Sequence, residues 1–266
     1  MGQQPHKYEN LLNREFHADR PNRKWVTDIS YIHTKQGVLY LSMIRDLYDN
    51  SIVAYKTGTQ QTVNLVLDTI RLAMEQLKGS GVKISIATKS DLILRDLDLI
   101  KTFPDARVSW SVNTLDENFK NDMDSAVSIQ RRLAAMKAFH DAGIRTTCFV
   151  SPIFPGITDG KAIIGRAKGQ CNLIWLENLN LRGSYKAAIL DYIRERYPQL
   201  VPLYQEIYQK GNRTYWELLD RELKRYAAEI GLDYVTSDDS MKRPFDAPPV
   251  IVNCFYHEQI KKSARR

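Results

Sequence analysis

Residues 106–159 read ARVSWSVNTLDENFKNDMDSAVSIQRRLAAMKAFHDAGIRTTCFVSPIFPGITD. Apolar and small polar residues alternate over 107–114, which predicts a strand with one buried face. Apolar residues then recur at helical spacing over 125–142, Gly143 ends this helix, and a second strand begins at Ile144. Strand, crossover helix and strand make one βαβ unit with parallel strands.

The alternation of strands and helices continues on both sides of this unit. Strands are predicted at 82–90, 107–114, 144–151 and 173–181, with helices at 92–101, 125–142 and 161–168. This βαβαβαβ order is typical of parallel units that form a sheet or a partial TIM-like barrel. After it the pattern is helical, and helices are expected at 185–197, 200–209 and 214–230.

The N-terminal part has a different pattern. Strands are predicted at 25–33, 38–49 and 51–58, and their short connections favour an antiparallel meander, followed by a helix over 62–78. The fold class is therefore α/β, with a meander and helix before the parallel units. The expected domains are an irregular lead-in at 1–24, the meander segment at 25–78, the parallel units at 79–183, a helical region at 184–241 and a basic tail at 242–266.

Composition limits the classes of protein that the chain can belong to. The 266 residues are 43% hydrophobic, which is enough for a sizeable core, while the longest apolar runs fall far short of a membrane span. The first thirty residues contain no signal-peptide core, so we expect a cytoplasmic protein. The three cysteines, Cys148, Cys171 and Cys254, stand 23 and 83 positions apart, which suits neither a disulfide framework nor a metal knuckle.

The chain has a net charge of +7, and a positive net charge is a feature of many proteins that bind nucleic acid. Much of the excess lies in residues 242–266, which hold six Lys and Arg against two acidic residues. Such a segment is more often a solvated terminus than a phosphate clamp. We therefore expect DNA binding, if it occurs, to be weak and carried by this tail.

The segment ENLLNREFHADRPNRKWVTDISYIHTKQGVLYLSMIRDLYDNSIVAYKTG resembles the opening of the catalytic core of insertion-sequence transposases of the DDE type. These enzymes are related to retroviral integrases and share a ribonuclease-H-like fold, and the resemblance covers about residues 8–75. It implies DNA integration by two Mg²⁺ ions held by three acids, with Asp28 as the first acid and a metal ligand. The family's second acid, in a His-Ser-Asp-Gln-Gly type motif, and its third, a helical glutamate, have no matching motif here.

From the residues alone, Asp28 has a second interpretation. It lies in a predicted strand, where an unpaired buried carboxylate would be costly, so it faces either a cleft or a Lys or Arg partner. A third possibility joins the two halves of the chain. If strand 82–90 pairs beside strand 25–33, Ser90 and Asp91 occupy the strand end where the family places its second acid, and Asp91 approaches Asp28 as a catalytic pair. The alternative for Asp91 is a helix cap before Leu92.

A second resemblance covers about residues 77–257. VKISIATKSDLILRDLDLIK, VSWSVNTLDE, RRLAAMKAFHDAGI, VSPIFPGITD and LIWLENLNLRG resemble the later βα units of radical S-adenosylmethionine enzymes, nearest the spore photoproduct lyase-like subgroup. The resemblance implies S-adenosylmethionine and a [4Fe–4S] cluster as cofactors. It also implies a cofactor pocket lined by Lys89, Ser90, Ser111, Asn113, Arg132, Ser151 and Pro152. The alternative for each is ordinary strand-end chemistry, and for Arg132 a solvated salt bridge.

The chain departs from this second family at the cluster. The family holds its cluster by three thiolates in a Cys-x3-Cys-x2-Cys loop, and the sequence contains no such loop. Cys148 falls on a predicted strand and is expected to be a packed thiol.

Both resemblances together indicate a chimera of a transposase core segment and a radical S-adenosylmethionine protein segment. Three functional hypotheses follow: a fusion that lacks the complete catalytic machinery of either family, a radical S-adenosylmethionine enzyme, and a transposase acting in DNA integration. A second protein that supplies missing strands is a conceivable partner.

Overall fold

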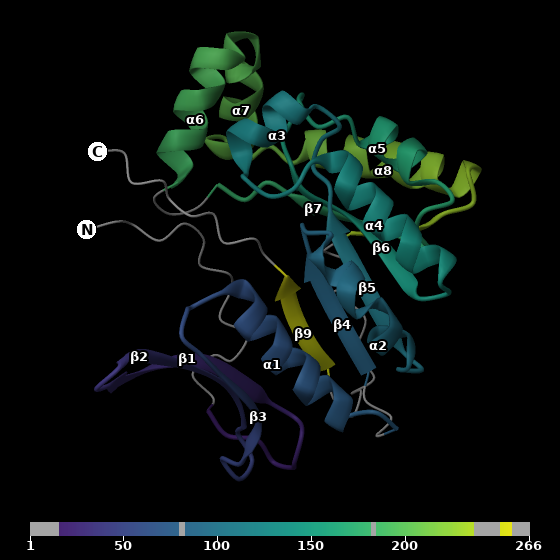
Figure 1. Ribbon diagram of the computed structural model, residues 1–266. Coiled ribbons are helices and arrows are strands. Elements are labelled where there is room, and N and C mark those ends of the chain that lie inside the picture. The colour runs from purple at the N-terminus through teal and green to yellow at the C-terminus, as the bar shows by residue number, and fades with distance from the viewer. Residues whose placement is uncertain (1–15, 80–82, 182–184, 237–250, 257–266) are drawn as a thin grey trace. The chain divides into compact units, whose positions relative to one another are not determined.

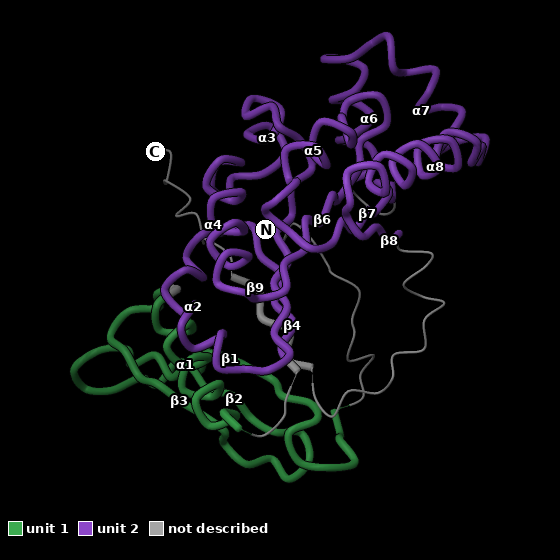
Figure 2. The backbone as a smooth tube through the Cα atoms, turned by 90° about the vertical axis from the view of Figure 1, so that its right-hand side faces the viewer, with its two compact units in different colours: residues 1–83, 248–252 green, residues 84–247, 253–266 purple. Residues whose placement is uncertain are grey.

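The computed structural model of the chain describes residues 16–79, 83–181, 185–236 and 251–256 (Figure 1). It divides into two compact units (Figure 2). The first comprises residues 1–83 and 248–252, and the second residues 84–247 and 253–266.

The first unit begins with an antiparallel sheet of order β1-β2-β3. Its strands are β1 (Trp25–Thr34), β2 (Gly37–Asp46) and β3 (Ile52–Gly58), followed by helix α1 (Val63–Gln76). The Thr62 hydroxyl caps α1 by accepting a hydrogen bond of 3.2 Å from the backbone N–H of Leu65. The predicted meander and helix are both confirmed.

One face of the three-stranded sheet packs against α1. Buried Ile44 and Ala54 of the sheet contact buried Ala73 of the helix, with Trp25 and Ile70 at the margin of the cluster. The alternation of side chains along a strand places Asp28 on the opposite face, because Asp28 pairs with Met43 while its neighbour Thr27 pairs with Ile44.

Most of a six-stranded sheet of order β8-β7-β6-β5-β4-β9 lies in the second unit. Its strands are β4 (Lys83–Thr88), β5 (Ala106–Ser111), β6 (Arg145–Ile153), β7 (Leu173–Asn178), β8 (Asp233–Thr236) and β9 (Ile251–Tyr256). Neighbouring strands from β4 to β8 pair in parallel. The predicted parallel units are confirmed.

Helices connect the parallel strands. A 3-10 turn (Leu92–Asp96) and α2 (Leu97–Lys101) follow β4, α3 (Glu117–Met123) and α4 (Ile129–Asp141) follow β5, and α5 (Gly160–Ala167) follows β6. The helical region consists of α6 (Tyr185–Arg196), a 3-10 turn (Pro198–Leu200), α7 (Val201–Tyr208) and α8 (Thr214–Glu229). Gly143 ends α4 with a φ of 83°, a left-handed conformation that glycine adopts at no steric cost.

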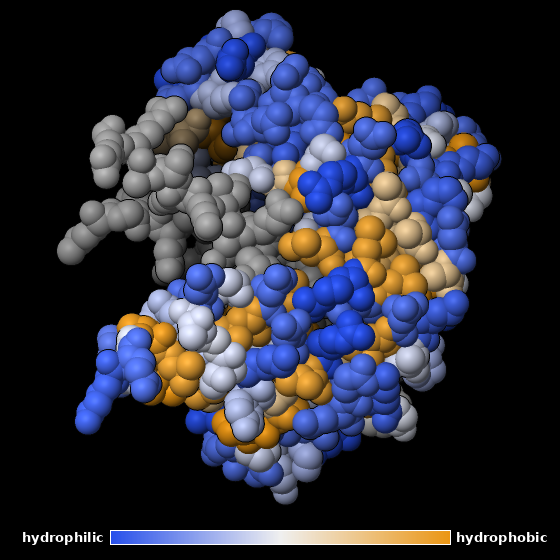
Figure 3. Space-filling view, in the orientation of Figure 1, coloured by the Kyte–Doolittle hydropathy of each residue, from blue (hydrophilic) through white to orange (hydrophobic). Residues whose placement is uncertain are grey.

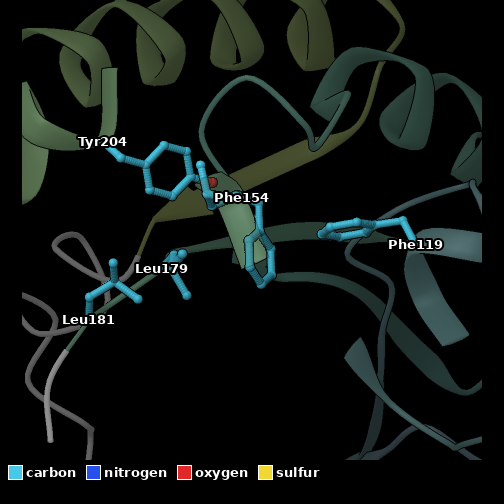
Figure 4. Close-up of a cluster of buried hydrophobic side chains, with 6 residues drawn as sticks. Phe119, Phe154, Leu179, Leu181 and Tyr204 are labelled. Atoms are coloured by element: carbon cyan, nitrogen blue, oxygen red, sulfur yellow. The ribbon is translucent and has the colours of Figure 1, made fainter. Parts of the chain in front are cut away.

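Two groups of buried side chains hold together the part of this unit that the structure describes. Trp110 of β5 and Phe139 of α4 meet edge to face, with ring centroids 5.3 Å apart, beneath the crossover helix. The second cluster, drawn in Figure 4, joins the carboxyl side of the sheet to the helical region and consists of Phe119, Phe154, Leu179, Leu181, Ile193 and Tyr204. The helices after β5 and β7 are thereby fixed to the strand ends that they follow.

The structure corrects four expectations. The predicted pairing of strand 82–90 with strand 25–33 is wrong, because β4 lies between β5 and β9, and β1 belongs to the other sheet. The basic tail at 242–266 was expected to be a solvated terminus but contains β9, and the helical region at 184–241 also contains β8. The crossover helix begins at residue 129 rather than 125, because the Ser128 hydroxyl accepts a hydrogen bond of 3.3 Å from the Arg131 N–H and caps it there.

Among the described residues, no helix is long and apolar enough to cross a bilayer.

Candidate cofactor site at the carboxyl ends of the parallel strands

The topology brings the predicted cofactor-binding residues of the second unit to one edge of the sheet. Lys89 and Ser90 follow β4, Ser111 is the last residue of β5, and Ser151 lies in β6 near its end. Carboxyl ends of adjacent parallel strands meet at the same edge, and open α/β sheets bind their ligands there. Asn113, two residues after β5, belongs to the same edge.

The ends of β5, β6 and β7 are joined by serine hydroxyls. Ser111 Oγ donates a hydrogen bond of 2.9 Å to the Ser151 carbonyl, and Ser151 Oγ donates one of 2.5 Å to Glu177 Oε2. The peptide bond between Ser151 and Pro152 is cis. Glu177 was not among the predicted residues, although its place at the end of β7 was a signal that could have identified it.

Arg132 is fully buried, and each nitrogen of its guanidinium group donates a hydrogen bond to another part of the protein. Nε donates to the Val127 carbonyl at 3.0 Å, Nη1 to the Ser111 carbonyl at 3.1 Å, and Nη2 to Asp124 Oδ1 at 2.6 Å. The solvated salt bridge that was the alternative for this residue is wrong, because the side chain of Arg132 is 0% exposed. In the structure, Arg132 fixes the loop before α4 to the end of β5.

Asp124 is the centre of a charged cluster that also contains Arg132, Lys89 and Lys120. Lys89 Nζ lies 3.0 Å from its Oδ2 and Lys120 Nζ 3.8 Å from its Oδ1. Burial raises the pKa of Asp124, but the charges of Lys89 and Arg132 outweigh burial, so the pKa lies below its ordinary value. Three cations thus surround one ionised carboxylate.

Asn113 differs from the other strand-end residues because part of its side chain is unsatisfied. It is 2% exposed, and its Oδ1 accepts no hydrogen bond in the part of the chain that the structure describes. Its backbone carbonyl accepts from Thr158 Oγ1 at 2.9 Å, which fixes the loop. A buried acceptor without a donor costs about 1–3 kcal/mol, so Asn113 is the strand-end residue best suited to accept a hydrogen bond from a ligand.

Ser90 and Asp91 are occupied by local structure. Ser90 Oγ accepts from the Leu92 N–H at 3.1 Å, and the Ser90 carbonyl accepts from Trp110 Nε1 at 3.2 Å. Asp91 is the cap residue before Leu92, as the alternative expected, but its side chain makes no capping hydrogen bond. Its carboxylate instead forms a bidentate pair with Arg131, with both N–O distances 2.7 Å.

Asp28 lies on the exposed part of β1 in the first unit. Its Oδ1 accepts a hydrogen bond of 2.8 Å from the Ile29 N–H, and no Lys or Arg pairs with it among the described residues. The common site of Asp28 and Asp91 was predicted on the condition that β1 and β4 pair, and they do not. The structure therefore provides no support for that catalytic pair.

Cys148 and Cys171 do not fit an iron–sulfur cluster. Cys148 on β6 and Cys171 before β7 are both buried, and burial raises the pKa of each thiol, that of Cys171 to about 11. Cluster ligands are thiolates, so these environments oppose ligation. No group of three potential metal ligands occurs in the described part of the chain. The expectation that Cys148 is a packed thiol on a strand is confirmed.

Comparison with known proteins supports both resemblances. The Radical SAM superfamily matches residues 40–163. The chain is 32% identical over 165 residues to the uncharacterized protein MJ0683 of Methanocaldococcus jannaschii, over 62% of this chain and 58% of that protein. It is also 45% identical over 69 residues to a probable transposase for the insertion sequence element IS1353 of Shigella flexneri, over 26% of this chain and 13% of that protein.

A further curated relative and a solved structure also match parts of the chain. Transposase InsF for insertion sequence IS3A of Escherichia coli is 36% identical over 70 residues, covering 26% of this chain and 24% of that protein. The crystal structure of Streptococcus suis SuiB bound to S-adenosylmethionine aligns with a TM-score of 0.41 at 13% identity, covering 66% of this chain and 37% of that one.

The superfamily match begins inside β2 and ends inside α5. It includes β5, α4 and β6, the βαβ unit that carries Ser111, Asn113, Arg132 and Ser151. Residues 40–163 are therefore similar to the Radical SAM superfamily, and the N-terminal region is similar to insertion-sequence transposases.

Proposed function

We propose that this chain is a radical-SAM-like scaffold joined to a transposase-like segment, and that by itself it does not cleave S-adenosylmethionine. The observation that carries the proposal is the cysteine set. The sequence has three cysteines in all, at positions 148, 171 and 254, and no two of them are close enough in sequence to belong to a cluster loop. Reductive cleavage needs a cluster with one open iron, which three thiolates leave free.

The strand ends retain only part of what a cofactor pocket needs. Ser90, Ser111 and Arg132 bond to the protein itself, whereas Asn113 Oδ1 is a buried acceptor to which no described residue donates. When bound, S-adenosylmethionine would supply donors for that oxygen, and Asn113 would orient it. Because the other groups are already satisfied, we expect binding to be weak.

The transposase-like segment is proposed to be inactive for a related reason. Two-metal strand transfer needs several carboxylates that converge on the ions. In the first unit, Asp28 is the residue that matches a catalytic acid of the family, and its carboxylate is exposed and bonded to the adjacent backbone. A single carboxylate does not hold two Mg²⁺ ions.

The proposal is tested by incubating the reconstituted chain with S-adenosylmethionine and dithionite under anaerobic conditions and measuring 5′-deoxyadenosine. We expect no product above that of a blank without protein. A radical SAM enzyme with its cysteine loop, treated in parallel, controls for the reagents. Formation of 5′-deoxyadenosine in proportion to the amount of chain would contradict the proposal.

A further inference from the structure

A groove between α3 and α6 lies outside the cofactor residues described above. Its volume is about 480 Å³, within the range of about 300–1,000 Å³ that small-molecule pockets occupy. Helix α3 follows the carboxyl end of β5, and α6 follows that of β7, so the groove belongs to the side of the sheet where α/β folds bind ligands. The surface over these helices is largely hydrophilic (Figure 3).

Three aromatic rings form the apolar part of the groove. Phe119 is 2% exposed, and its ring centroid lies 6.2 Å from that of Tyr192 and 6.4 Å from that of Tyr197. The two tyrosine centroids are 6.0 Å apart. The Tyr192 hydroxyl donates to Asp122 Oδ2 at 2.7 Å, which fixes its ring. Fixed aromatic rings at the edge of a groove offer faces on which a planar ring can stack.

The rest of the lining is polar and planar. Asn118 makes no side-chain hydrogen bond among the described residues. Asn121 accepts from Lys120 Nζ at 3.2 Å through Oδ1, which leaves its amide hydrogens available to a ligand. The remaining groups are the carboxylates of Asp116 and Asp122 and the guanidinium of Arg196, which lies 3.9 Å from Asp122. Amide, carboxylate and guanidinium groups together offer both donors and acceptors.

We propose that this groove binds the base of a nucleoside, stacked on a tyrosine and bonded along its edge to the asparagine amides. A nucleobase is a flat ring with donors and acceptors in its plane, which matches aromatic faces combined with planar amides. The lining holds two carboxylates against one guanidinium, so it repels phosphate. A nucleoside is therefore favoured over a nucleotide.

The test is saturation-transfer NMR of the whole chain with adenosine, guanosine, cytidine and uridine, each at millimolar concentration. At least one nucleoside should receive saturation mainly on its base protons, and its 5′-monophosphate should bind several-fold more weakly. Tyr197→Ala should lower affinity about tenfold, since stacking on an aromatic side chain contributes about 1–3 kcal/mol per base. Tyr55→Ala, at a tyrosine of β3 that is 62% exposed, is the matched control and should bind as the wild type does.

Tyr197 also packs against buried residues, so Asn118→Ala provides a second variant at an exposed helix position that does not endanger folding. It should weaken binding several-fold. The proposal is overturned if no nucleoside binds, if Asn118→Ala binds as tightly as the wild type, or if methyl glucoside competes, because competition would identify a site for sugars.

Discussion

Replacing Arg132 by methionine should destabilise the second unit by about 3 kcal/mol. Methionine fills the space of the arginine stem but donates no hydrogen bond. The carbonyls of Ser111 and Val127 then lose their donor, at about 1–3 kcal/mol for each buried group left unsatisfied. Asp124 keeps its ion pairs with Lys89 and Lys120 in this variant. Leaving a buried charge without any partner costs about 3–5 kcal/mol of unfolding free energy, so only part of that cost applies here.

The assay is urea denaturation followed by circular dichroism. With a typical slope of about 1–3 kcal/mol per molar urea, the loss corresponds to a midpoint lowered by roughly 1–3 M at unchanged slope. Arg131→Met is a matched control on the same helix. The Arg131 side chain is 54% exposed and pairs with Asp91, so its removal should cost at most about 1 kcal/mol. Equal midpoints for the two variants would show that the buried hydrogen bonds of Arg132 do not stabilise the second unit.

The pKa of Asp124 is lowered in the folded protein, so its ionised carboxylate stabilises the fold at pH values above its ordinary pKa. This stabilisation is lost as the pH falls through the pKa of the folded state. The difference in unfolding free energy between the wild type and Asp124→Asn should therefore shrink below about pH 4. Deleting residues 261–266 should abolish most DNA binding in gel-shift assays at low salt, and unchanged affinity would assign binding to the core. Gly160→Ala should lower the unfolding free energy by about 1–3 kcal/mol, because the alanine Cβ would lie 2.6 Å from Leu223 Cδ1. An unchanged midpoint of thermal unfolding would contradict this prediction.

The elements that the sequence predicted correctly have local signals. The βαβ unit was found because residue alternation, helical spacing and Gly143 all lie within one short stretch, and the meander because its connections are short. Helix α3 was missed although its signal is also local: Asp116 accepts from the N–H groups of Asn118 and Phe119, and Glu117 follows in the first turn. That pattern is a typical helix start.

Pairings between distant segments were not predictable from the sequence. β9 pairs with β4 although more than 160 residues separate the two strands in the sequence. No local sequence pattern specifies the sheet edge with which a terminal strand pairs. The same limit explains the wrong pairing of β4 with β1. The order of three strands, a helix and a fourth strand along the chain is compatible with a single mixed sheet. The hydrophobic pattern of the strands does not distinguish such a sheet from two separate sheets.

The candidate site was predictable in position but not in detail. Strand ends placed Ser111, Asn113 and Ser151 at one edge, as the topology requires. The partners of Arg132 were not predicted, because Asp124 lies in a loop whose path the sequence does not determine. Resemblance to the family suggested that Arg132 lines a pocket, whereas its three hydrogen bonds describe a residue that holds the loop and the strand end together.

The iron that the chain retains after reconstitution shows whether it holds a [4Fe–4S] cluster. The wild type and a variant with Cys148, Cys171 and Cys254 all replaced by alanine are reconstituted with iron and sulfide under anaerobic conditions, desalted and analysed for iron and for cluster absorption. We expect both proteins to retain the same small amount of iron and to show no cluster band. About four irons per chain in the wild type alone, with a cluster band that survives desalting, would contradict the account.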